Sequence, residues 1–347
     1  MQDEIYVLAD GKLLENFLNY RVESNLFVAD DAFSLGLADP DTKVEEGSLC
    51  ELYVNGVQEL TGIIESIDEN CDKSGKTLTV EGRDLLGMLT DSYAEEFLSL
   101  EKIGLKALAN RLLRPFKFIN RKDIVFDKGN KLRAVPLTKT PEDFEFAQVE
   151  PGQSVFEALN GYAVSQGMLL FSKANGTLVF GEPKTSGAAE FDIVFRRDGK
   201  GNNAFRGGRN RNISKRYSKV IVTGQKQGTA TGAAADVNAK GEVVDDTFPK
   251  GLYKPFVATV QYDGQDPKKY ARVLMDKQRF DGNKVTYSVK GHSQNKKNWQ
   301  VNSICSVEDT WNNVHGEFLI YGRTFELDRE QGPITTLQLS TKGVLPA

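Results

Sequence analysis

GSLCELYV at residues 47–54, TGIIESID at 61–68 and KTLTVEG at 76–82 are the three segments that decide the fold. Apolar and polar residues alternate in each of them, a pattern typical of β-strands with one buried face. In the third segment Leu78 and Val80 point to one side, whereas Thr79 and Glu81 point to the other. The stretch 47–89 is therefore predicted to form part of a small antiparallel barrel.

A similar triplet returns between residues 302 and 345. It reads SICSV at 303–307, FLIYGRTFEL at 318–327 and TTLQLS at 335–340. The offset between the two triplets stays near ~255 to 258 residues through all three strands. Constant spacing favours an internal duplication, although two unrelated β-meanders of short strands can also resemble each other by chance. The second copy predicts a second barrel.

A mixed α/β segment is predicted between the two copies. Apolar residues at helical spacing, ended by Pro115, predict a helix over about residues 101–114. Ser154 and Glu157 form a capping-box pattern at the start of a second helix, which Gly167 ends. Asn175-Gly176 between two apolar runs then predicts a β-hairpin.

The C-terminal part begins with a predicted strand at 220–222, followed by a Gly- and Ala-rich segment, 228–250, that predicts a mobile insertion. Asp266 with Pro267 predicts a helix start, and Asp281-Gly282 predicts its end. The fold class is thus α+β, mainly β, with two similar small antiparallel β-barrels flanking a central α/β domain. The expected domains are 1–92 (first barrel), 93–205 (α/β domain) and 206–347 (return strand, insertion, helix and second barrel).

Charge is strongly segregated, although the net charge is only −4. Residues 23–72 hold thirteen acidic residues and one basic residue, whereas 196–219 hold nine basic residues and one acidic residue. Such separation predicts surfaces for different partners, or surfaces that meet between subunits. The candidate acidic channel or interface residues are Asp30, Asp31, Asp39, Asp41, Glu45 and Glu46. The candidate basic contact residues are Arg196, Arg197, Lys200, Arg206, Arg209, Arg211, Lys215, Arg216 and Lys219.

Both charged stretches are predicted to be exposed loops. Residues 30–41 lack the ligand spacing of a calcium-binding loop, so a solvated acidic loop is expected there. Gly and Asn residues favour an exposed loop over 196–219. This basic loop could bind nucleic acid through phosphate contacts, contact an acidic subunit, or remain solvated. The acidic stretch could line a channel or face a basic neighbour.

Several classes of function are disfavoured. No nucleophile elbow, phosphate-binding loop, metal-binding His pair or CxxC occurs, so we expect no enzyme activity, cofactor or metal. The two histidines, His292 and His315, are expected on the surface, and Cys50 and Cys305 are expected to be buried strand residues. No apolar run is long enough to cross a membrane, and the N-terminus is acidic where a signal peptide would be basic.

One family resemblance covers the general layout of the chain. QVEPGQSVFEAL at 148–159, QGMLL at 166–170, NGTLVF at 175–180 and SKVIVTGQ at 218–225 resemble segments of Mu-like phage tail baseplate hub proteins. That contractile-tail family is related in fold to the hub part of type VI secretion spikes.

The resemblance implies a homotrimer in which two similar barrels per subunit form a ring of six. The implied partners are the tail tube protein, the central spike protein, other baseplate proteins, and DNA that leaves through the channel without sequence-specific binding. The implied location is the virion tail baseplate, assembled in the bacterial cytoplasm. Two alternatives stay open: an OB-like module that binds nucleic acid or carbohydrate, and an enzyme whose active site forms between subunits.

Overall fold

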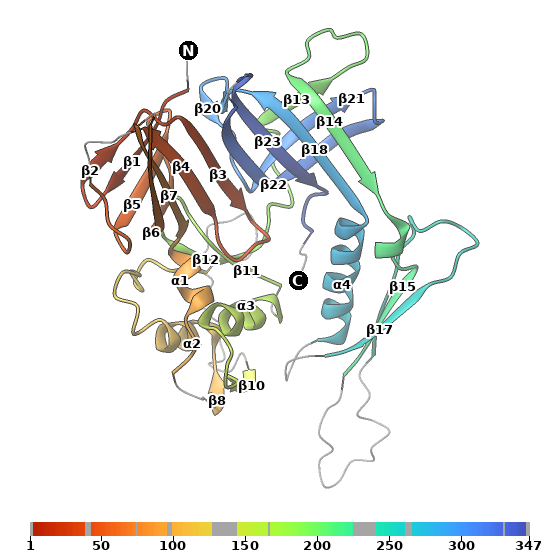
Figure 1. Ribbon diagram of the computed structural model, residues 1–347. Coiled ribbons are helices and arrows are strands. Elements are labelled where there is room, and N and C mark those ends of the chain that lie inside the picture. The colour runs from red at the N-terminus through yellow and green to blue at the C-terminus, as the bar shows by residue number, and fades with distance from the viewer. Residues whose placement is uncertain are drawn as a thin grey trace.

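The computed structural model describes residues 3–38, 43–73, 75–95, 99–126, 144–165, 167–224, 240–260, 266–328 and 330–344. Residues 228–239 of the predicted insertion lie outside this set. The prediction is wrong for residues 240–250, because Lys240–Val244 form a paired strand and Phe248 is buried. Within the described chain, strands predominate and antiparallel pairing dominates the largest sheet (Figure 1). The sequence-based assignment to a mainly β, α+β fold is confirmed.

The N-terminal half of the main sheet contains seven antiparallel strands in the order β2-β1-β5-β6-β7-β4-β3. The alternation noted in the sequence has the predicted effect, because Leu78 and Val80 are buried while Thr77 and Glu81 are exposed. The strands are β1 (Ile5–Ala9), β2 (Lys12–Leu14), β3 (Asn19–Asn25), β4 (Ala32–Ala38), β5 (Leu49–Val54), β6 (Val57–Asp72) and β7 (Gly75–Asp84).

The C-terminal half has the order β14-β18-β23-β22-β21-β13, with only β13 and β21 parallel. Its strands are β13 (Phe191–Phe195), β14 (Ala204–Arg211), β18 (Asn283–Lys290), β21 (Ser303–Asp309), β22 (Val314–Asp328) and β23 (Gly332–Ser340). A short hairpin, β19 (Ser293–Gln294) with β20 (Lys297–Asn298), follows β18.

The two halves repeat one arrangement of six strands. Taken in chain order, β1, β3, β4, β5, β6 and β7 have the same neighbours as β13, β14, β18, β21, β22 and β23, and only the first strand differs in direction, because β1 is antiparallel to β5 whereas β13 is parallel to β21. Both central pairs also carry an irregularity at the matching place, between Ile64 and Ser66 in β6 and between Ile320 and Gly322 in β22. A shared bulge position is difficult to explain by chance. The repeat therefore extends beyond the three strands visible in the sequence.

The halves are joined into one sheet by antiparallel pairing of β3 with β22, from Arg21 opposite Glu326 to Asn25 opposite Gly322. One hydrophobic core contains residues of both halves, including Leu35 and Leu52 with Tyr287 and Leu337. Neither half forms a closed barrel within the described residues, so the two separate barrels of the sequence prediction are not confirmed. The sequence could not show that an edge strand of one half would extend the sheet of the other.

The central α/β segment packs below the N-terminal half in Figure 1 and has its own core around Leu108, Leu159 and Phe180. The capping box is confirmed: Glu157 N donates to Ser154 Oγ at 3.1 Å and Ser154 N donates to Glu157 Oε2 at 3.0 Å. The hairpin at Asn175-Gly176 is also confirmed. The elements are α1 (Leu85–Asp91), β8 (Ser99–Ile103), α2 (Leu105–Leu112), β9 (Val125–Phe126), β10 (Phe144–Gln148), α3 (Val155–Ser165), β11 (Leu169–Ser172) and β12 (Leu178–Gly181).

The helix predicted over 101–114 is shorter than expected. Its first residues belong to β8, which pairs with β10, and the helix α2 begins only at Leu105. The helical spacing of leucines was correct from that residue onward, because Leu105, Leu108 and Leu112 are buried on one face. Pairing with a strand some forty residues later is not visible in a local pattern.

A third unit lies beside the C-terminal half (Figure 1). Its three-stranded sheet packs on a helix through Val220, Val222, Tyr270 and Met275. The helix begins as predicted, with the Asp266 carboxylate accepting from Lys268 N at 2.9 Å and Pro267 in its first turn. The elements are the 3₁₀ turn η1 (Ile213–Lys215), β15 (Lys219–Thr223), β16 (Lys240–Val244), β17 (Pro255–Thr259) and α4 (Pro267–Asp281).

The prediction that both charged stretches form loops is wrong in part. Residues 32–38 of the acidic stretch form β4, and residues 204–211 of the basic stretch form β14. In β14 a side chain at Gly207 would lie 2.8 Å from atoms of the Phe195 and Tyr287 rings. The absence of a side chain at Gly207 therefore serves close packing against aromatic rings and does not mark a loop.

Candidate functional site

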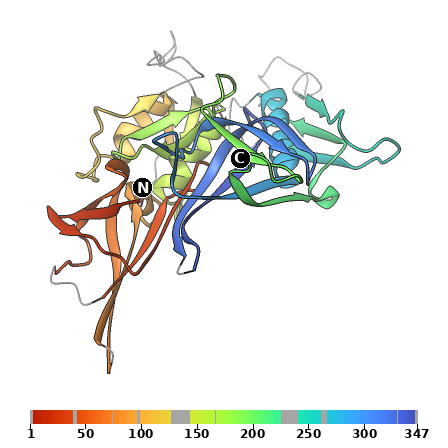
Figure 2. The same cartoon turned by 90° about the horizontal axis from the view of Figure 1, so that it is seen from above.

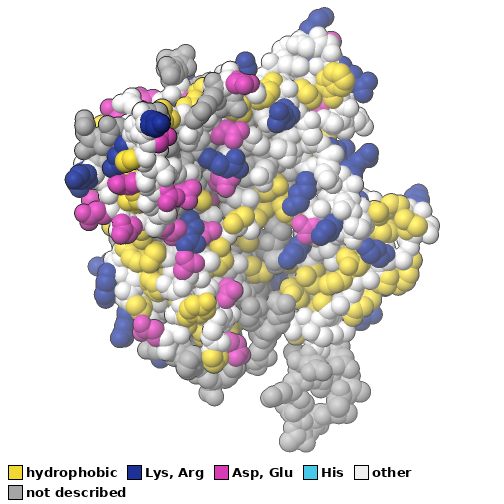
Figure 3. Space-filling model, in the orientation of Figure 1, with side chains coloured by type: hydrophobic (Ala, Val, Ile, Leu, Met, Phe, Trp, Pro, Cys, Tyr) yellow, Lys and Arg dark blue, Asp and Glu magenta, His cyan; other side chains and the backbone are white. Residues whose placement is uncertain are grey.

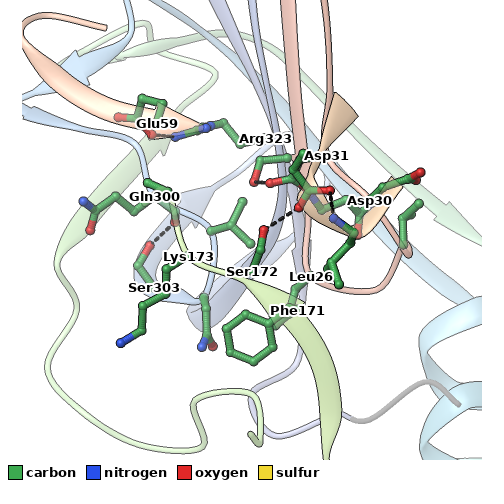
Figure 4. A pocket seen from close by; sticks show the side chains of 18 of the residues that line it. Leu26, Asp30, Asp31, Glu59, Phe171, Ser172, Lys173, Gln300, Ser303 and Arg323 are labelled. Atoms are coloured by element: carbon green, nitrogen blue, oxygen red, sulfur yellow. Dashed lines mark hydrogen bonds and ion pairs between the residues drawn. The ribbon is translucent and has the colours of Figure 1, made fainter. Parts of the chain in front are cut away.

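A pocket of about 450 Å³ lies where the two halves of the main sheet meet the central α/β segment (Figure 4). Its walls come from the β3–β4 turn, the start of β6, strand β11, the segment 300–303 and strand β22. Leu26 and Phe171 give it an apolar side, and charged residues of both signs complete the lining. The pocket is thus the place where the three parts of the fold contact one another.

A buried ion pair crosses the joint between the halves. Arg323 of β22 is 4% exposed, and its Nη1 lies 2.6 Å from Glu59 Oε2 of β6. The same Nη1 donates to the backbone oxygen of Trp299 at 2.8 Å, and the guanidinium lies over the Phe325 ring. Asn298 Nδ2 donates to Glu59 Oε1 at 2.7 Å. Glu59 of the N-terminal half is therefore held by Arg323 and Asn298 of the C-terminal half.

Two carboxyl groups, the buried Asp84 and the half-buried Asp31, stand on the other side of the pocket. Asp84 is 3% exposed, accepts from Leu86 N at 3.1 Å as the N-cap of α1, and is hydrogen-bonded to the Ser172 hydroxyl of β11. Asp31 accepts from Ser24 Oγ at 2.5 Å and from Asn25 N at 2.8 Å. Burial, with Asp31 nearby, raises the pKa of Asp84 to about 8, and burial also raises the pKa of Asp31. Near neutral pH this site therefore retains a proton that an exposed carboxyl would lose.

We expect Asp84→Asn to remove part of the pH dependence of stability. Folded Asp84 keeps its proton up to about pH 8, whereas the unfolded chain loses it above about pH 4, so the wild type loses stability as pH rises through this window. Asparagine keeps the N-cap without titrating. The variant should therefore gain up to about 4 kcal/mol relative to wild type between pH 5 and pH 8. Urea unfolding at both pH values measures this, and a difference that does not change with pH would contradict it.

The candidate acidic residues do not form a single surface. Asp30 Oδ2 accepts from Arg83 Nη1 at 2.8 Å, and Arg83 also holds Glu65 and Asp91, so Asp30 belongs to an ion-pair network. Asp31 lies inside the joint, whereas Glu45 and Glu46 are exposed. Asp39 and Asp41 lie outside the described residues. The acidic stretch thus contributes both to the interior and to the surface.

The candidate basic residues divide into three groups. Arg196 pairs with Glu308, Arg216 with Asp245 at 2.6 Å, and Lys219 with Glu242 at 2.5 Å, so these three are neutralised within the chain. Arg209 donates to Asn283 Oδ1 and the Asn313 backbone oxygen, and Arg197 lies over the Trp311 ring. In the described part of the chain, no acidic partner pairs with the exposed Lys200, Arg206, Arg211 and Lys215.

The predicted charge segregation is visible on the surface. Figure 3 shows most of the acidic side chains over the half that contains β1–β7, whereas Lys and Arg predominate over the other half and the third unit. The folded protein therefore keeps the charge segregation of the sequence, although several of the charged residues form ion pairs within the chain.

Of the two histidines, only His315 is at the surface as predicted. His292 is fully buried, with Nε2 2.7 Å from Tyr20 Oη and Nδ1 3.1 Å from Thr335 Oγ1. It thus bridges the two halves, and burial lowers its pKa to about 4. Its neighbours in space come from distant strands, so no local signal could reveal this role. Cys50 and Cys305 are buried strand residues, as predicted.

Arg323, Glu59 and Asp84 were not singled out by the sequence. Asp84 had a detectable signal, because an Asp directly before an apolar run is typical of an N-cap. Arg323 and Glu59 had none, since each lies in an ordinary strand. Among the described residues no cluster of His, Cys, Asp and Glu could hold a metal ion. None of the described helices combines the length and the apolar character that a membrane crossing needs.

Comparison with known proteins gives consistent results. Residues 4–84 match the family model described as Mu phage baseplate assembly protein GpP-like, N-terminal. The baseplate hub protein gp44 of Escherichia phage Mu is 22% identical over 358 aligned residues, covering 99% of this chain and 89% of that protein.

Two solved structures have the same fold. The tail protein from Neisseria meningitidis MC58 has a TM-score of 0.83 and 25% identity, covering 100% of this chain and 99% of the other. The 43 kDa tail protein of prophage MuSo2 from Shewanella oneidensis has a TM-score of 0.78 and 20% identity, covering 98% of both chains. The resemblance to Mu-like phage tail baseplate hub proteins that the sequence predicted is confirmed, and it extends over the whole chain.

Proposed function

We propose that this chain is a structural, non-enzymatic hub of a contractile phage or prophage tail. It would act as a homotrimeric adaptor between the six-fold tail tube and the three-fold central spike. The observation that carries the proposal is the repeat of six strands in the two halves of the chain. The names of the relatives, a baseplate hub protein and two tail proteins, support the same role.

The repeat explains how one protein could join two symmetries. Three chains with two similar modules each present six similar docking positions while they keep a three-fold axis. One face would then hold the tube, the opposite face would hold the spike, and other baseplate proteins would contact the periphery. In such a ring the curved halves would act as the six barrel-like walls of a channel for DNA exit, without sequence-specific contacts. Assembly in the bacterial cytoplasm would place the protein in the virion tail baseplate.

The oligomeric state tests this proposal. Size-exclusion chromatography with light scattering is expected to give three times the chain mass of 38.5 kDa. Negative-stain images should show a ring with six density maxima around a central hole. A monomer at every concentration tested, or a closed dimer, would contradict the proposal.

The four exposed basic residues without an acidic partner favour one alternative, a module that binds nucleic acid. Such binding would be independent of sequence and would weaken steeply as salt concentration rises, because Lys and Arg would replace counterions of the phosphates. Titration of a fluorescent oligonucleotide at two salt concentrations distinguishes the two functions. A monomer with a steep salt slope would favour the binding module, whereas a trimer without measurable affinity supports the hub.

A further inference from the structure

The joint between the halves uses a specific free edge of β22. Strand β21 pairs with β22 only as far as Ile320, and the same side of β22 then pairs with β3 from Gly322 to Glu326. Strand β23 occupies the opposite side throughout this stretch. An ion pair between Arg21 Nη1 and Glu326 Oε2 at 3.3 Å accompanies the strand pairing. At the joint, the edge strand β3 thus pairs with the part of β22 that the shorter strand β21 leaves unpaired.

The N-terminal half has the same edge, but there it is open. Strand β5 pairs with β6 only as far as Ile63, and residues 66–72 of β6 pair with β7 alone. Figure 2 shows this β6–β7 ribbon extending beyond the neighbouring strands. Its outer part is exposed and carries three acidic residues, Asp68, Glu69 and Asp72, of which Glu69 also pairs with Lys76 of β7 at 3.2 Å. The described chain offers no strand to fill this edge.

The C-terminal half has the strand that corresponds to β3, and its outer edge is also open. This strand, β14, pairs with β18 alone, as β3 pairs with β4 in the other half. Most of its residues are exposed, and it carries Arg206, Arg209 and Arg211. A long exposed strand edge is a site for pairing with another chain unless it is covered.

We propose that β14 of one subunit pairs antiparallel with residues 66–72 of β6 in the next subunit, in the same way as β3 pairs with β22 within the chain. This inference rests on the proposed trimeric hub and names its subunit contact. The occupant of each open edge is a second copy of the same chain, because the two edges carry opposite charge. The contact is heterologous, so repeating it produces a closed ring if the rotation is that of a trimer.

The internal joint also predicts the register of the contact. Phe325 opposes Val22 in the joint, and the matching bulges relate Phe325 to Glu69. Val22 faces Phe33 of β4, and Arg209 faces Val285 of β18. Because Phe33 and Val285 occupy matching positions in the two halves, Val22 corresponds to Arg209. Glu69 should therefore lie directly opposite Arg209.

The same register extends to the neighbouring positions. Asp72 falls opposite Arg206, and Asp68 falls opposite Asn210. Opposite charges directly across a strand pair stabilise it, whereas like charges there are destabilising. The backbone hydrogen bonds of the strand pair would supply most of the affinity, and the charges would select the partner and the register.

Charge reversal with rescue tests the register in the full-length protein. Glu69→Arg and Arg209→Glu are each expected to raise the apparent dissociation constant of the trimer by about tenfold or more, because each places like charges opposite each other at three contacts. The double variant should return to within about threefold of wild type. Glu45→Arg, an exposed acidic residue outside the predicted contact, is the control and should not change assembly. Light scattering over a concentration series measures all four variants.

Cross-linking gives an independent readout. In a Cys71→Ser background, Asp68→Cys with Asn210→Cys places two cysteines directly opposite each other at a distance that a disulfide can span. Mild oxidation is expected to give covalent trimers on a non-reducing gel, and either cysteine alone should give none.

The outcomes separate this inference from the proposed function. A wild-type trimer that neither charge reversal weakens and that does not cross-link would overturn the β14–β6 contact and leave the hub proposal standing. A wild-type protein that is monomeric at every concentration would overturn both.

Discussion

Arg323→Met is expected to lower the free energy of unfolding by about 3–5 kcal/mol, because it leaves the buried Glu59 carboxylate without its cationic partner. The side chains of Arg323 and Glu59 are only 3% and 7% exposed, so water compensates poorly for the lost contact. The substitution also removes the donor to the Trp299 backbone oxygen. Methionine has nearly the length of the arginine stem, so loss of packing contributes little. Urea unfolding followed by tryptophan fluorescence measures the change.

The double variant Arg323→Met with Glu59→Leu is the control for this prediction. Removing both charges leaves no uncompensated buried ion, and such replacements are often neutral or stabilising. We therefore expect the double variant to recover at least half of the stability that Arg323→Met loses. If the single substitution costs less than about 1 kcal/mol, or if the second substitution makes the loss larger, the ion pair does not hold the joint.

This joint matters beyond stability. In a ring built from repeated modules, the contact within the chain and the contact between chains have equivalent positions. The buried pair of Arg323 and Glu59 stabilises the internal contact. The charges of β6 and β14 are exposed, which suits a contact that forms during assembly. Weakening the internal joint should therefore also reduce trimer formation, because the register of one half relative to the other would be lost.

Local signals in the sequence predicted local structure well. The capping box at Ser154, the Asn175-Gly176 turn and the Asp266-Pro267 helix start all involve residues within a few positions of one another. Each signal acts through a backbone hydrogen bond or a preferred dihedral angle, which the chain satisfies wherever it folds. The strand alternation in β7 succeeded for the same reason.

Predictions that depended on distant partners were the ones that failed. Segment 204–211 has the composition of a loop, yet β18, more than seventy residues later, makes it a strand. His292 has no apolar context in sequence, but β3 and β23 enclose it. Charge runs predicted exposed loops, whereas Asp31 is half-buried and accepts hydrogen bonds from Ser24 and Asn25. Long-range pairing decided each case, and a single sequence does not contain it.

The duplication also shows how much a single sequence leaves undetected. The sequence revealed three strands of the repeat, and the structure shows six, because the strands β3, β4, β14 and β18 share no recognisable pattern. What the halves have kept is backbone geometry, including the matching bulges in β6 and β22. Individual positions have diverged: Gly82 opposes Ile64 in the first half, where Leu339 opposes Ile320 in the second.

Gly82→Ala is expected to cost about 2–4 kcal/mol, since close packing here leaves no space for a methyl group. An added Cβ would lie 2.2 Å from the Ile63 backbone oxygen and 2.6 Å from Cζ of Phe33. The oxygen belongs to a paired strand and cannot move without breaking the ladder, and the Phe33 ring is itself buried in the main core. Relief of the clash must therefore separate β6 from β7 next to the bulge. Urea unfolding of the purified variant measures the loss.

Gly208→Ala is the matched control, because this glycine also lies in a strand, but an added Cβ would meet no atom within 4 Å. Its stability should stay within about 0.5 kcal/mol of wild type. Equal losses at the two positions would indicate a general intolerance of side chains in these strands and would contradict the steric argument. A loss confined to Gly82 would show that close approach at the bulge fixes the course of the β6–β7 ribbon. Since residues 66–72 of that ribbon form the proposed subunit edge, Gly82→Ala should then weaken the trimer as well, whereas Arg323→Met acts on it only through the internal joint.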